Sequence, residues 1–92
     1  MVENTVFVGD KPFMNYVTSV VVQFSSKEAQ EVLIKARGRF INRAVDIAEV
    51  VKNKFLQNLI DTKKIEIDTE EFISDQGKEV GVSTIKITLS RI

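Results

Sequence analysis

The sequence predicts an α/β fold of the two-layer α+β kind, with the element order β-α-β-α-β-β. We expect a four-stranded mixed sheet with two helices on one face and a β-hairpin that projects as an arm. Apolar residues recur at helical spacing in two separate stretches, and a short β-branched run precedes each of them. The last third alternates apolar and polar residues on both sides of a glycine turn. Two helices on one face of such a sheet bury their apolar stripes and leave the other face open.

The first strand and the first helix are predicted in the N-terminal quarter of the chain. Thr5 to Val8 is a short apolar, β-branched run that is typical of a strand. Pro12 follows, at a position where a helix can begin. The β-branched residues 20–22 favour a strand by propensity, but the helical spacing outweighs them. Four apolar residues spaced three, four and three apart form the predicted stripe: Met14, Val17, Val21 and Phe24.

The second strand and the second helix are predicted on either side of Gly38. Residues 31–36 hold the buried strand, which Gly38 ends. The helix that follows has the longest apolar face in the chain. Its predicted members are Ile41, Ala44, Val45, Ala48, Val51, Phe55 and Leu59. We expect Asp61-Thr62 to turn the chain into the last two strands.

The apolar residues of the last two strands change parity along each strand. Those on the predicted body are odd-numbered and those near the turn at 75–78 are even-numbered: Ile65, Ile67, Ile85, Ile87 and Leu89 against Phe72, Val80 and Val82. A change of parity moves side chains to the opposite face. We therefore expect a ribbon with two zones, which projects as an arm beyond about Asp68 and Ser83 and has a bulge at the junction. Two slightly irregular strands without a projection are the alternative.

The composition excludes several classes of function. The chain has no cysteine and no histidine, which removes thiol nucleophiles, thiolate metal sites and the usual general base. We therefore expect no enzymatic activity, no cofactor, no metal and no small-molecule substrate. No apolar run is long enough to span a membrane, and the first residues lack the pattern of a signal peptide. We expect residues 1–92 to form a single domain that resides in the cytoplasm.

Positive charge is concentrated in residues 34–46, although the whole chain is neutral, with 13 basic and 13 acidic residues. Four basic residues and no acidic residue lie between Val32 and Val45. We call these four the basic strip: Lys35, Arg37, Arg39 and Arg43. The glycine turn among them allows a close approach to another backbone. A cationic strip around a glycine turn suits a polyanion, and nucleic acid is the expected one.

Four segments carry motifs in a fixed order along nearly the whole chain. They are Gly-Asp-Lys-Pro-Phe-Met-Asn-Tyr-Val at 9–17, the segment 34–46, Asn-Lys-Phe-Leu at 53–56 and Val-Ser-Thr-Ile at 82–85. Together they resemble the Alba family of archaeal chromatin and RNA-binding proteins. The resemblance implies a homodimer of this unit, which is related to the C-terminal domain of bacterial translation initiation factor three.

The resemblance also implies a mode of action. The body of the dimer is expected to lie along the phosphates of double-stranded DNA while the two arms reach toward the minor groove, and RNA is expected to be bound as well. Further contacts between dimers would coat or bridge duplexes, which places the protein on the chromosome, in the nucleoid. Phe55 matches the aromatic residue of that dimer–dimer interface, whereas its spacing alone places it in the core.

The predicted nucleic-acid-binding residues combine the basic strip with the family motifs. Lys11 matches the second lysine of the family's lysine pair, and Lys78 is the one basic residue near the tip of the arm. A solvated surface role is the alternative for Lys11, Arg37 and Arg39, and a cap-like or solvated role is the alternative for Asn42. The full set is Lys11, Lys35, Arg37, Gly38, Arg39, Asn42, Arg43 and Lys78.

Two departures from the family pattern predict reduced affinity for DNA. Asp10 stands where the family usually has its first lysine, a site of regulatory acetylation there, so that switch cannot operate here. Residues 65–79 contain six acids and one base, a net charge of −5, against +4 for the basic strip. An acidic arm is poorly suited to the negative potential of the minor groove. Two alternatives therefore stay open: a mainly RNA-binding protein, or a protein–protein partner of a more basic paralogue in a heterodimer.

Overall fold

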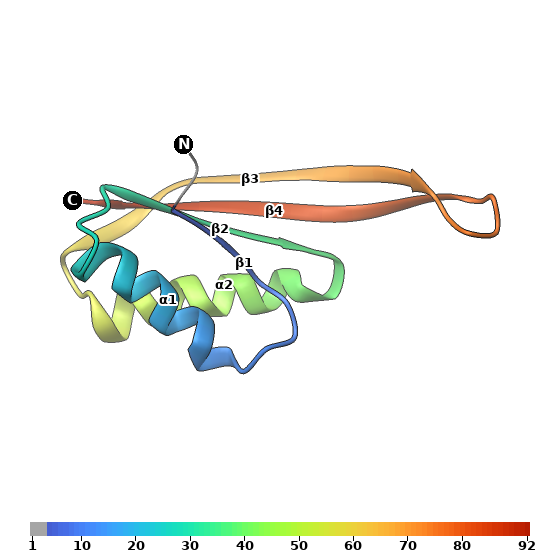
Figure 1. Ribbon diagram of the computed structural model, residues 1–92. Coiled ribbons are helices and arrows are strands. Elements are labelled where there is room, and N and C mark those ends of the chain that lie inside the picture. Colours follow the sequence, from blue (N-terminus) through green and yellow to red (C-terminus); the bar gives the residue numbers. More distant parts are fainter. Residues whose placement is uncertain (1–3) are drawn as a thin grey trace.

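The computed structural model describes residues 4–92 and has two layers, with both helices on the same face of one sheet (Figure 1). The elements are β1 (Thr5–Phe7), α1 (Phe13–Ser25), β2 (Glu31–Arg37), a 3₁₀ turn η1 (Gly38–Phe40), α2 (Ile41–Val50), a π-helical turn η2 (Val51–Phe55), β3 (Ile60–Ile73) and β4 (Glu79–Arg91). The strands lie in the order β1-β2-β4-β3. β1 is parallel to β2, and the other two pairs are antiparallel. The predicted fold class and element order are confirmed.

The core lies between the helices and the sheet, and each helix is rotated slightly from the predicted stripe. On α1 the buried side chains are Tyr16, Val17, Val20 and Phe24, whereas Met14 is exposed. On α2 Ile47 is buried in place of the exposed Val45. The prediction that Met14 lies on the buried face of the first helix was therefore wrong. Tyr16 turns into the core instead, and its hydroxyl accepts hydrogen bonds from the backbone of the preceding loop. None of the helices in the described residues is both long and apolar enough to cross a membrane.

The second helix ends earlier than its apolar spacing predicts, because its last turn is widened. The N–H of Leu56 donates to the carbonyl of Val51 at 2.9 Å, a spacing of five residues instead of four. Leu56 consequently takes the buried position next to Val51, and Phe55 is left 49% exposed. Asn58, with φ +65°, then reverses the chain, so that β3 begins at Ile60. The predicted helical position of Leu59 and the predicted turn at 61–62 are both wrong.

The hairpin of β3 and β4 extends beyond the rest of the molecule as an arm (Figure 1). Pairing of β4 with β2 stops where Arg37 faces Thr84, but the β3–β4 ladder continues to the pair Ile73–Glu79. Among the strands of residues 4–92, residues 69–83 therefore pair only with each other and project as an arm, as predicted. The ladder is unbroken at this junction, and the one irregularity of register lies between Thr62 and Lys64. The predicted bulge at the junction is wrong: the apolar residues change face within a regular ladder.

The edge strand β3 is uncovered on the side that faces the helix layer. Ile65 and Ile67 pair with the buried Ile87 and Ile85, so they share the helix-side face of the sheet. They are nevertheless 59% and 79% exposed, because α2 packs against β2 and β4 and leaves the outer strand free. The sheet thus has a partly covered face and, as predicted, an open face.

Candidate nucleic-acid interface

The loops that follow β1 and β2 are held together at one end of the two-layer body, on the side from which the arm projects (Figure 1), and we call them the loop end (residues 9–12 and 37–43). The guanidinium of Arg43 donates from Nη1 to the carbonyl of Gly9 at 2.6 Å and lies 5.7 Å from the centre of the Tyr16 ring. The Tyr16 hydroxyl accepts from the backbone N–H groups of Gly9 and Lys11, both at 3.0 Å. Two segments that are distant in sequence therefore form one surface, with Lys11 on the first loop.

Gly38 makes the sharp passage from β2 into α2. Its φ is +58°, in the left-handed region that residues with a Cβ rarely adopt. A Cβ there would meet Val82 at an ordinary 3.6 Å, so the backbone conformation rather than the space requires glycine. The turn leaves Arg37 and Arg39 exposed on either side. The Arg39 guanidinium lies 4.4 Å from the centre of the Phe40 ring, which is a cation–π distance.

The structure brings some of the predicted residues together and separates others. Lys11, Arg37, Arg39 and Asn42 are exposed at the loop end around Gly38. Arg43 is half-buried at the same end, where its guanidinium positions the first loop. These positions are compatible with phosphate contacts, although the assignment of each residue stays a prediction.

Three other predicted residues lie away from the loop end. Lys35 is half-buried in β2, on the open face of the sheet, with its ammonium 5.7 Å from the centre of the Phe7 ring. Lys78 lies in the turn at the tip of the arm, where the N–H of Ser74 donates to its carbonyl. Phe55 lies in η2, which follows the C-terminal end of α2. Because α2 begins at the loop end, Phe55 lies beyond the opposite end of that helix. The exposure of Phe55 shows that the core position expected from its spacing was wrong.

The acidic arm contacts the basic strip directly, which sequence reasoning missed. Glu70 and Arg37 form an ion pair of 3.5 Å, and both side chains are more than half exposed. The contact follows from the strand register: Arg37 is opposite Thr84, Thr84 is opposite Asp68, and Glu70 lies two residues beyond Asp68 on the same face of the sheet. An exposed pair of this kind contributes at most about 1 kcal/mol. Glu70 therefore competes weakly with any anion that approaches Arg37.

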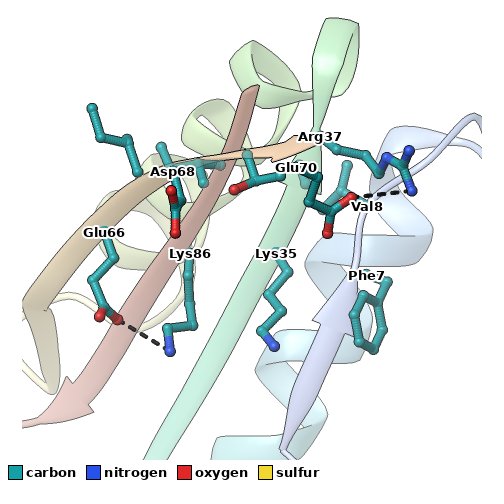
Figure 2. Close-up of a pocket in the computed structure, with 12 residues that line it drawn as sticks. Phe7, Val8, Lys35, Arg37, Glu66, Asp68, Glu70 and Lys86 are labelled. Atoms are coloured by element: carbon teal, nitrogen blue, oxygen red, sulfur yellow. Dashed lines mark ion pairs between the residues drawn. The ribbon is translucent and has the colours of Figure 1, made fainter. Parts of the chain in front are cut away.

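Ion pairs also organise the open face of the sheet (Figure 2). Glu66 lies 3.2 Å from the ammonium of Lys86 and 3.5 Å from that of Lys64. The hydrogen bond from Lys86, with the charge of Lys64 beside it, holds the pKa of Glu66 below its ordinary value. These pairs therefore persist at neutral and mildly acidic pH. Within residues 4–92 no cluster of His, Cys, Asp or Glu is arranged to hold a metal ion.

The fold and the loop end together define a two-layer α+β protein with a cationic end and a hairpin arm. The sequence model of the Alba family matches residues 4–69, and the chain belongs to that family. The chain is 55% identical over 91 residues to DNA/RNA-binding protein Alba 1 from Archaeoglobus fulgidus, with 99% of each chain covered. It is 52% identical over 89 residues to DNA/RNA-binding protein Alba from Methanocella arvoryzae, covering 97% of this chain and 91% of the relative.

Solved structures agree with this assignment. Alba from Thermoplasma volcanium superimposes with a TM-score of 0.87 at 46% identity, covering 96% of this chain and all of that one. ALBA1 from Trypanosoma brucei gives a TM-score of 0.73 at 25% identity, over 96% of this chain and 68% of that one. The family is non-enzymatic, as the sequence predicted for this chain.

Proposed function

We propose that this chain is a DNA- and RNA-binding protein of the Alba family that binds double-stranded DNA mainly through phosphate contacts at the loop end. The observation that carries the proposal is the Arg43–Gly9 hydrogen bond, which joins the loop of Lys11 to the turn of Arg37 and Arg39. It gives one exposed surface with three cations from two loops. Such a surface matches the spaced charges of a phosphate backbone and reads no base sequence.

The proposed binding unit is a homodimer. The side of β3 that faces the helix layer exposes Ile65 and Ile67, and Val45 and Leu59 are exposed on or after the second helix. Large exposed apolar side chains on a small protein indicate an interaction surface. A second copy covering them would present two loop ends to one duplex. Light scattering of the purified protein tests this step: the mass of a dimer is expected, and the mass of a monomer contradicts it.

Charge supports a modest affinity for duplex DNA, and the organisation of the chromosome is the role that we propose for this binding. Asp10 is exposed beside Lys11, and Glu70 pairs with Arg37, so two of the three cations have an acidic neighbour. RNA is the second candidate ligand, because many of the relatives that the chain matches are named for both nucleic acids. The arm is acidic over most of its length and contributes little to duplex binding. The exposed ring of Phe55 is proposed to serve contacts between dimers.

A pair of double variants tests the proposed function. Arg37→Ala with Arg39→Ala is expected to lower the affinity for a duplex of about 20 base pairs by about tenfold or more at low salt, because each dimer loses four phosphate partners. The matched control, Lys27→Ala with Lys54→Ala, removes the same charge from exposed positions outside the loop end. Fluorescence anisotropy measures both. Equal losses in the two variants would contradict the proposed site, as would binding that neither variant changes.

A further inference from the structure

The open face of the sheet presents a row of side chains that crosses all four strands. Phe7, Lys35, Lys86 and Glu66 lie directly opposite one another in register. With the neighbouring row they line a hollow of about 510 Å³ (Figure 2). Hollows of this volume are in the range of ligand-binding sites. This face lies on the opposite side of the sheet from the apolar surface proposed for the dimer, so it stays accessible in that assembly.

Phe7 is the most unusual residue of this face. It is 71% exposed, although both of its chain neighbours, Val6 and Val8, are buried. Strand alternation turns its ring outward, where nothing in residues 4–92 covers most of it. Lys35, directly opposite on β2, holds its ammonium 5.7 Å from the ring centre, within the cation–π range. An exposed ring beside a cation is the combination that binds a base and its phosphate.

Charge is divided unequally between the two halves of the open face. The half formed by β1 and β2 lines the hollow with Phe7, Lys35 and Arg37 and contributes no carboxylate to it. The acids come from β3, and two of them already bind cations: Glu66 binds Lys86, and Glu70 binds Arg37. A phosphate is therefore attracted to the β1–β2 half, next to the aromatic ring.

We propose that the open face binds a segment of single-stranded nucleic acid, with one base stacked on Phe7 and the adjoining phosphate at Lys35. The base must be unpaired, because a base within a duplex does not offer its face to a side chain. Arg37 belongs to both this face and the loop end, so a strand that leaves Phe7 reaches the proposed phosphate surface. In this respect the inference rests on the proposed function, but it adds a separate site and a separate class of ligand.

The test is the binding of a labelled oligothymidylate of about 12 nucleotides, measured beside the duplex at the same salt concentration. Phe7→Leu keeps an apolar side chain but removes the aromatic face. It is expected to lower the affinity for the single strand by about tenfold to a hundredfold and to change duplex affinity by less than about twofold. Phe7→Tyr keeps the aromatic face and is expected to retain single-strand binding. That result would show that the loss in Phe7→Leu comes from lost stacking and not from a change in folding.

Phe72→Leu is the matched control, because it makes the same substitution at another exposed phenylalanine, on the arm. It is expected to leave both affinities unchanged. Unchanged single-strand affinity in Phe7→Leu would overturn the inference, and so would equal losses for the single strand and the duplex. Either result would leave the proposed function intact if the Arg37 and Arg39 double variant still lost duplex binding. Failure of the wild-type chain to bind either nucleic acid would instead contradict the proposed function itself.

Discussion

The loop end follows two strands of the sheet and the arm extends the other two, yet these neighbouring regions carry opposite charges. The loop end exposes Lys11, Arg37 and Arg39, whereas the arm, residues 69–83, has four acidic residues and one basic residue, a net charge of −3. The two regions meet in the ion pair between Arg37 and Glu70. The arm thus has the projecting geometry that suits a groove but lacks the charge to enter one. The projecting shape and the positive charge thus belong to different parts of one fold. We therefore assign the proposed affinity for DNA to the loop end.

Reversing the charge of the arm is expected to have the largest effect on the affinity for duplex DNA. Glu70→Lys with Glu71→Lys changes each arm by four units of charge and frees Arg37 from its ion pair. We expect duplex affinity to rise by about a hundredfold or more at low salt, with a steeper dependence on salt. Anisotropy titrations measure the gain. Glu70→Gln with Glu71→Gln, which only removes the charge, is expected to give a smaller gain; no gain in either variant would mean that the arm lies away from bound DNA.

Removing the Arg43 guanidinium should separate the two halves of the loop end. Arg43→Ala deletes the hydrogen bond to Gly9 and is expected to destabilise the fold by about 1.5–3 kcal/mol, as for bonds made by charged donors. Because the loop of Lys11 is then less restrained, duplex affinity should fall as well. Chemical denaturation and binding measure the two effects. A loss of affinity without any loss of stability would show that Arg43 contacts phosphate directly.

Placing a basic residue at position 10 is expected to have the smallest effect on the affinity for duplex DNA. Asp10→Lys should strengthen duplex binding by up to about 1 kcal/mol per subunit, the size of an exposed charge interaction. Asp10→Asn is the neutral comparison and should give about half the gain. Competition binding at low salt resolves such differences. A weaker complex would mean that Asp10 faces away from the nucleic acid.

Much of the fold could be predicted from hydrophobic periodicity. The element order, the open sheet face and the arm follow from the spacing of apolar residues, because each element must bury one side. The end of α2 could not be predicted in this way. The π turn inserts one residue into the apolar repeat, so Leu56 replaces Phe55 on the buried side. Such a turn depends on how the helix end packs against the sheet, which a repeat of 3.6 residues does not encode.

The candidate site was only partly predictable. The glycine turn and its flanking arginines are local in sequence, so Arg37, Gly38 and Arg39 could be found from it. The bond from Arg43 to Gly9 joins residues 34 positions apart, and it depends on how α2 packs beside the first loop. Phe7 was overlooked because it lies within an apolar run, where only strand alternation distinguishes an outward ring from a buried one. Contacts of this kind require the tertiary structure.

The salt dependence of duplex binding tests the central claim most directly. If about six phosphates are contacted per dimer, the slope of log affinity against log salt concentration should be about −5 for the wild-type protein. Arg37→Ala with Arg39→Ala should flatten this slope by several units, since those side chains release most of the counterions. An unchanged slope in the double variant would contradict the claim that the loop end is the phosphate-binding surface.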